Sequence, residues 1–139
     1  MLLETPIDLS HATADESFPE VDPGILPLGS RIMVQIRRAR AQTKSGIFIP
    51  EDVRKTEASN TQVSKVIGVG SLAFKNRNTM ELWPEGAWCQ IGDYVRTPKY
   101  GGDRWTVRFG EEEIEFVIYN DLDVIGKITG DPTKIRAFI

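Results

Sequence analysis

The chain has 139 residues, of which 40% are hydrophobic and 27% charged, a balance typical of one compact soluble domain. A formal net charge of −3 gives no overall positive field for nucleic acid. The single cysteine, Cys89, and the single histidine, His11, exclude an intrachain disulfide and a structural Cys/His zinc site. They also exclude a Cys–His or Ser–His catalytic pair built around a core imidazole.

No apolar run approaches the length of a membrane span, so no membrane partner is expected. The first residues, Met1-Leu2-Leu3-Glu4, lack the basic start of a signal peptide. A cytosolic protein is therefore the expectation.

Residues 1–24 carry six acidic residues and no Lys or Arg, which leaves +3 on the rest of the chain. Three prolines and several small polar residues interrupt this segment. Such a composition is typical of an irregular, extended or partly disordered acidic arm.

Two strands are predicted early in the chain. After Ile25-Leu26-Pro27-Leu28, the segment 31–37 alternates Ile32, Val34 and Ile36 with more polar residues. This alternation predicts a strand that is buried on one face. Residues 63–70 predict the next strand.

Between these strands lies a long polar segment, about residues 38–62, that contains three consecutive apolar residues, Ile47-Phe48-Ile49. A buried strand is usually longer and better bounded. The triplet is therefore either a short strand laid back on the core or an exposed anchor for another protein. Periodicity alone leaves both interpretations open and favours the buried strand.

The remaining chain is rich in turn signals and short strands. Gly92-Asp93 and Tyr100-Gly101-Gly102 mark turns, and residues 71–87 predict an irregular excursion or a loose hairpin. Further strands are expected at residues 94–96, 104–109, 114–119 and 124–128, followed by a tail at 129–139. Short strands without sustained helical periodicity predict an all-β barrel or sandwich.

Three further motifs have simpler structural explanations. Gly68-Val69-Gly70 with Ala73 has dinucleotide-turn spacing, but the residues that follow do not make the required helix. The basic cluster Arg37–Arg40 could bind a single nucleic-acid strand on a small barrel, together with the aromatic residues Trp105, Phe109, Phe116 and Tyr119. These aromatic residues alternate with charged ones as core positions do, however, so a place in the barrel core is favoured. Glu111-Glu112-Glu113 is expected to be a solvated turn.

Taken together, the motifs resemble the GroES-like co-chaperonin (ten-kilodalton chaperonin) family. Pro27–Val34 resembles the opening strand of that family, and Thr43–Pro50 resembles its mobile loop, which carries an apolar tripeptide after glycine. Lys65–Gly70 resembles the strand after the loop. The family's central signature is matched by Ile91–Val95 with Lys99–Gly102, and its closing strand by Asp121–Ile128.

The resemblance covers about residues 25–128 and has departures. The loop has one glycine, Gly46, where two are common, and Phe48 stands where a smaller aliphatic residue is usual. Residues 71–87 do not clearly match the family's roof hairpin. The arm 1–24 and the tail 129–139 are additions, which suit a divergent or viral member and, in that case, a host cytoplasm.

The resemblance implies a small all-β, GroES-like β-barrel with a long mobile loop and irregular terminal extensions. It implies a ring, usually a heptamer, that caps a chaperonin cylinder over unfolded client proteins. It implies no active site, metal or cofactor on this chain, since the ATPase belongs to the partner. The loop residues would bind the chaperonin's apical domains: Lys44, Ser45, Gly46, Ile47, Phe48 and Ile49.

The resemblance also implies a subunit interface, in which the first and last strands pair between neighbours and close open sheet edges. The residues expected there are Ile25, Leu26, Leu28, Val124, Ile125 and Ile128. Two alternatives stay open: a barrel that binds nucleic acid through Arg37–Arg40, and a structural or interaction barrel without chaperonin binding.

Overall fold

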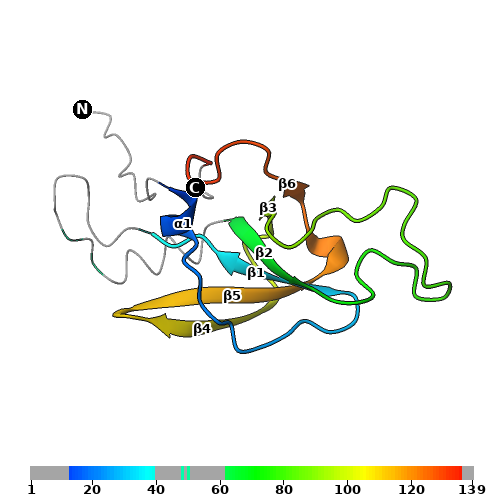
Figure 1. Ribbon diagram of the computed structural model, residues 1–139, viewed down its shortest axis with the longest axis horizontal. Coiled ribbons are helices and arrows are strands. Elements are labelled where there is room, and N and C mark those ends of the chain that lie inside the picture. Colours follow the sequence, from blue (N-terminus) through cyan, green and yellow to red (C-terminus); the bar gives the residue numbers. More distant parts are fainter. Residues whose placement is uncertain (1–12, 40–47, 49, 51–61, 136–139) are drawn as a thin grey trace.

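The computed structural model describes residues 13–39, 48, 50 and 62–135. The regular secondary structure of this part of the chain is mostly β-strand, with one four-residue helix and one short 3₁₀ helix (Figure 1). The elements are α1 (Ala14–Ser17), β1 (Arg31–Ile36), β2 (Val63–Val69), β3 (Tyr94–Arg96), β4 (Asp103–Phe109), β5 (Glu112–Asn120), the 3₁₀ helix η1 (Asp121–Asp123) and β6 (Gly126–Lys127). The all-β prediction is confirmed.

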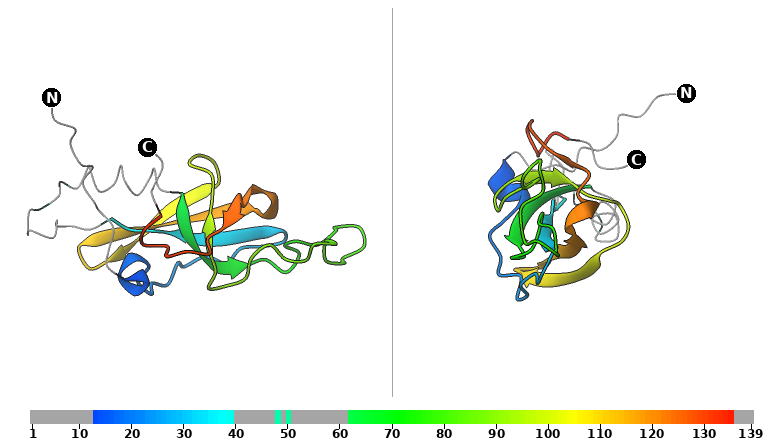
Figure 2. Two further views of the ribbon diagram at one scale, coloured as in Figure 1. Left: turned by 90° about the horizontal axis from the view of Figure 1, so that it is seen from above. Right: turned by 90° about the vertical axis from the view of Figure 1, so that its right-hand side faces the viewer.

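The strands form one antiparallel sheet in the order β4-β5-β1-β2-β3-β6. The sheet curls around its inner face, as the end-on view in Figure 2 shows. A register shift at Met33/Val34 marks a bulge between β1 and β2, which bends the sheet. Apolar residues from β1, β2, β3 and β5 fill the interior, joined by Phe74 and Cys89. The curled sheet agrees with the small barrel that the sequence predicts, although no pairing of β4 with β6 closes it among the described residues.

The prediction that β1 is buried on one face only is wrong. Met33 and Gln35, expected to face solvent, are buried together with Ile32, Val34 and Ile36. The reason is the N-terminal arm, which packs over the outer face of the sheet. Its Pro19 carbonyl accepts a hydrogen bond from Gln35 Nε2 at 2.8 Å.

The described part of the arm, residues 13–24, has one short helix, α1, and no other regular secondary structure. Thr13 caps α1 by accepting a hydrogen bond from the Glu16 amide at 3.2 Å. Phe18 is buried and lies against the Tyr94 ring, with centroids 5.3 Å apart. Further on, the Pro23 carbonyl accepts a hydrogen bond from Trp105 Nε1 at 2.9 Å.

The excursion expected at residues 71–87 contains a tight hairpin that projects away from the sheet (Figure 1). The backbone amides of Asn76 and Trp83 donate to the carbonyls of Glu81 and Phe74, at 2.8 and 2.9 Å. At its base, the rings of Phe74, Trp83 and Trp88 pack together, with centroids 5.0 to 6.0 Å apart. The aromatic cluster anchors the hairpin to the barrel.

The segment Gly68-Val69-Gly70 ends β2 at a turn, and no helix follows it among the described residues up to Cys89. The dinucleotide-turn spacing therefore has a structural cause. A Cβ atom at Gly70 would lie 2.2 Å from the Gly29 carbonyl oxygen and 2.9 Å from that of Arg31. Glycine permits this close approach of two backbone segments.

We expect Gly70→Ala to lower the free energy of unfolding by at least about 2 kcal/mol, because the clash is with backbone that cannot rotate away. Urea unfolding monitored by tryptophan fluorescence measures the change. Gly130→Ala is the control, since a Cβ at Gly130 meets no atom within 4 Å. Equal stability of the two variants would contradict the close approach at Gly70.

Candidate functional site

The apolar triplet of the loop lies mostly outside the described residues. Of the six residues expected to bind the chaperonin, the structure describes only Phe48, whose side chain is 75% exposed. Lys44, Ser45, Gly46, Ile47 and Ile49 lie outside the described residues. A phenyl ring exposed to this degree is not part of the barrel core, and it suits an anchor for another protein.

The two roots of the loop are packed on the barrel. At the outgoing root, the Arg38 amide donates to the Ser17 carbonyl at 3.1 Å, and Ala39 is buried. At the returning root, the Gln62 carbonyl accepts from the Thr97 amide at 2.9 Å. Residues 38, 39 and 62, which lie at the two ends of the expected mobile segment, therefore contact the barrel.

The residues expected at the subunit interface lie in two groups. In the first, Leu26 is 79% exposed, and Ile25 and Leu28 are also exposed. This segment is outside any strand of the isolated chain. Its exposed apolar side chains are available to a neighbouring molecule.

The second group surrounds β6, the strand at one end of the sheet order. Ile125 is exposed and Ile128 is half-buried, whereas Val124 is only 7% exposed and packs in the core of its own chain. β6 itself is two residues long, shorter than the strand expected at 124–128. β3 pairs with one of its edges, and no strand among the described residues pairs with the other.

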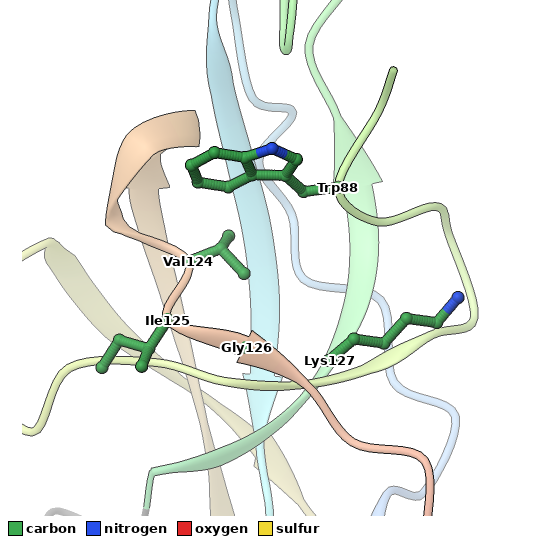
Figure 3. Close-up of a pocket in the computed structure, with 5 residues that line it drawn as sticks. All are labelled: Trp88, Val124, Ile125, Gly126 and Lys127. Carbon is green, nitrogen blue, oxygen red and sulfur yellow. The ribbon is translucent and has the colours of Figure 1, made fainter. Parts of the chain in front are cut away.

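A pocket of about 290 Å³ opens beside β6 (Figure 3). Trp88 lies across it from Val124 and Ile125, and Gly126 and Lys127 complete the lining. Sequence reasoning assigned no role to Trp88, Gly126 or Lys127. The apolar residue Ile125 next to Gly126 is the one signal that could have pointed to this pocket. The sequence does not show that Trp88 lies beside Ile125.

The basic cluster proposed for nucleic-acid binding is engaged within the protein. Arg37 is buried, and its Nη1 donates to the Pro132 carbonyl at 2.9 Å. Arg38 binds Glu112 at 2.6 Å, so Glu112 is an ion-pair partner and not merely part of a solvated turn. Arg40 lies outside the described residues. Arg37 and Arg38 are thus not available as a phosphate-binding surface.

The aromatic residues that could have stacked on bases differ in their exposure. Phe116 and Tyr119 are buried as expected for core positions, and Trp105 is half-buried with its ring 5.7 Å from that of Phe116. Phe109 is 39% exposed, so its expected core position is wrong. It lies under the guanidinium of Arg38, whose Cζ is 5.6 Å from the ring centroid.

The Gly92-Asp93 turn fixes the entry to β3. Gly92 has a φ of +98°, a conformation that favours glycine. The Asp93 carboxylate accepts a hydrogen bond from the Gln90 amide at 2.8 Å and pairs with Lys127 at 3.4 Å. The Asp93 side chain therefore connects the segment before β3 to Lys127 of β6.

Among the described residues, no group of His, Cys, Asp and Glu side chains is arranged to hold a metal ion. No helix within the described ranges is long and apolar enough to cross a membrane.

The comparisons with known proteins agree with this architecture. Residues 24–128 match the family model described as the chaperonin 10 Kd subunit. The chain is 32% identical over 107 residues to the mitochondrial 10 kDa heat shock protein of Saccharomyces cerevisiae, covering 77% of this chain and 91% of that protein. It is 35% identical over 107 residues to a 10 kDa chaperonin of Brassica napus, covering 77% and 96%.

A small antiparallel barrel that displays an exposed loop aromatic and an open β6 edge defines a protein built to assemble with others. The chain belongs to the chaperonin 10 family, the GroES-like co-chaperonins that assist chaperonin-mediated protein folding. Proteins of this family are non-catalytic regulators of their chaperonin.

The only cysteine, Cys89, follows the pocket residue Trp88 and is 3% exposed. Burial raises the pKa of its thiol to about 11, and the negative charge of Asp93 adds to the effect. Since the thiolate is the reactive form, we expect a thiol reagent at pH 8 to react about 100-fold more slowly than with an ordinary cysteine. The rate of thiol modification, followed by absorbance, tests this.

The same chain unfolded in urea is the control and should react at the ordinary rate. Fast modification of the folded protein would mean that the aromatic base of the hairpin opens readily and that Cys89 is not held in a closed core.

Proposed function

We propose that this chain forms a ring that caps a chaperonin cylinder, with the segment around Ile47–Ile49 of each subunit as the docking element. The observation that carries the proposal is the exposed Phe48 side chain in a chain of the chaperonin 10 family. In this proposal, the loop between β1 and β2 is mobile in the unbound ring and becomes ordered on the chaperonin's apical domains. Lys44, Ser45 and Gly46 lead into the apolar anchor.

The energetics of such a loop favour weak single contacts. Burying an apolar side chain contributes about 1.5–3 kcal/mol. Fixing the backbone of each loop residue costs about 1–2 kcal/mol. For three anchors and some eight ordered residues these contributions are of similar size, so one loop binds weakly. Several loops on one ring dock together, and avidity then makes the complex stable.

Ring formation would use the two exposed groups at the barrel edges. Ile25, Leu26 and Leu28 of one subunit would lie along β6 of its neighbour, against Ile125 and Ile128. This pairing would satisfy backbone groups at the open edge and cover apolar side chains. A heptamer is the ring size expected for this family. Val124 would support the interface from within, because its side chain is buried in its own core.

The ring would enclose unfolded client proteins in the capped cavity while the chaperonin hydrolyses ATP. The chain itself would need no cofactor and perform no catalysis. Several relatives carry the word mitochondrial in their names. For this chain the cytoplasm, or a host cytoplasm, remains the predicted compartment.

Replacing Phe48 and Ile49 with serine tests the docking element. We expect the double variant to keep its ring and its melting temperature, because Phe48 is exposed and outside the core. Binding to a purified chaperonin with ATP should fall at least 100-fold, since every loop loses most of its apolar burial. Calorimetry and a binding assay by light scattering provide the two measurements.

Phe116→Ala is the contrasting variant, because Phe116 is fully buried. It should lose about 3–5 kcal/mol of stability, as large core truncations do. If the loop variant melts early while its chaperonin binding is unchanged, the triplet is a core strand and the proposal is wrong.

Leu26→Glu tests the ring interface. Because Leu26 is exposed in the single chain, the subunit should still fold, but a charge buried against β6 should prevent ring closure. We expect mass photometry or sedimentation to show rings for the unaltered chain and monomers for the variant.

Tyr100→Glu is the control, as Tyr100 is similarly exposed but outside the proposed interface. A monomeric unaltered chain at micromolar concentration, or rings formed equally by both variants, would count against the proposed interface.

A further inference from the structure

Two segments lie outside the family match at residues 24–128, the arm before it and the tail after it. Their described parts are residues 13–23 and 129–135. Both parts contact the residues that directly follow β1 and lead into the loop, and the arm also contacts Gln35 and Trp105. In Figure 1, α1 of the arm lies beside the outgoing end of β1.

The tail contacts Arg37. The guanidinium Nη1 of Arg37 donates to the Pro132 carbonyl at 2.9 Å and to the Ile135 carbonyl at 2.5 Å. Arg37 is only 6% exposed, so the charge is removed from water. The tail keeps its shape through Asp131, whose Oδ1 accepts from the Thr133 amide at 2.9 Å and from its hydroxyl at 2.7 Å.

The arm contacts the next residue, Arg38. The Arg38 amide donates to the Ser17 carbonyl, and its Nε donates to the Glu16 carbonyl at 2.5 Å. The other end of the guanidinium binds Glu112 at the start of β5. Two consecutive residues at the loop root are therefore held by segments from opposite ends of the chain.

The returning root is held differently. Gln62 is bound through its carbonyl to the Thr97 amide and through its side chain to Arg96 Nη2 at 2.8 Å. Both partners belong to the barrel itself and lie within the family match. The described parts of the arm and the tail thus hold the outgoing root, whereas the barrel holds Gln62.

We infer that the arm and the tail form a clamp on the outgoing loop root, with Arg37 as its positioning residue. The clamp fixes the backbone at Arg37 and Arg38, the two residues that lead into the docking segment. Any root residue released from the clamp has to be ordered again on docking, and each one weakens binding by about tenfold. The inference rests on the proposed docking of the loop.

The test compares Arg37→Ala with the unaltered full-length protein. We expect amide exchange at Arg38 to become at least tenfold faster in the unbound protein, because the clamp no longer holds that backbone. Affinity for a purified chaperonin with ATP should fall about tenfold, with the ring intact by mass. Compared with Arg37→Ala, Arg37→Lys should show slower amide exchange at Arg38 and tighter chaperonin binding. The reason is that the lysine ammonium can still reach one of the two carbonyls.

Ile36→Val is the matched control. Ile36 is the buried neighbour of Arg37, and its truncation lowers stability without altering any contact of the tail. It should leave chaperonin affinity and Arg38 exchange unchanged. The inference is overturned if Ile36→Val weakens binding as much as Arg37→Ala does, or if Arg37→Ala changes neither exchange nor affinity.

A second variant covers the case in which Arg37→Ala does not fold. Asp131 is exposed, so Asp131→Ala loosens the tail without opening the core, and Asp131→Asn keeps an acceptor for Thr133. Asp131→Ala should speed Arg38 exchange and weaken binding, and unchanged values would overturn the inference. If the Phe48/Ile49 serine variant binds the chaperonin normally, the docking proposal itself is wrong. If that variant fails to bind while Arg37→Ala and Asp131→Ala bind as the unaltered protein does, only the clamp inference is wrong.

Discussion

The structure depends on the polar side chains of its central strand. β1 lies between β5 and β2 and is covered on its outer face as well, so Gln35, and Arg37 just beyond it, are cut off from water. An unsatisfied amide or guanidinium at such a place would cost several kcal/mol. The carbonyls of Pro19 and Pro132 accept their hydrogen bonds. The terminal segments therefore complete the barrel and do not merely extend it.

This arrangement also separates the rigid from the adaptable parts of the molecule. The strands, the aromatic base of the hairpin and the Gly92-Asp93 turn connect through buried contacts. Several large apolar side chains are instead exposed, and Phe48, residues 25, 26 and 28 and Ile125 are among them. Exposed apolar groups on a small protein commonly mark surfaces that other proteins cover. A ring-forming cap needs both kinds of surface, one for neighbouring subunits and one for the chaperonin.

Some expectations failed because a sequence pattern describes one strand and not its surroundings. The alternation of residues 31–37 is genuine, but the side predicted as solvent is covered by a segment far away in the sequence. In the same way, the arginines at 37 and 38 look like a basic patch until their partners at residues 16, 112 and 132 are known. Phe109 alternates like a core residue, yet it lies near the β4–β5 turn, where the sheet no longer covers it.

The sequence by itself determined the all-β class, most strand positions, the turns and the family, because alternation and glycine spacing are local properties of the chain. It also singled out Ile47–Ile49 as an unusual apolar triplet. Only the tertiary structure decided that Arg37 and Arg38 are buried or paired, that Phe18 belongs to the packed body, and that Trp88 lines a pocket with Ile125. These facts depend on contacts between segments far apart in the sequence, which form only when the whole chain is folded.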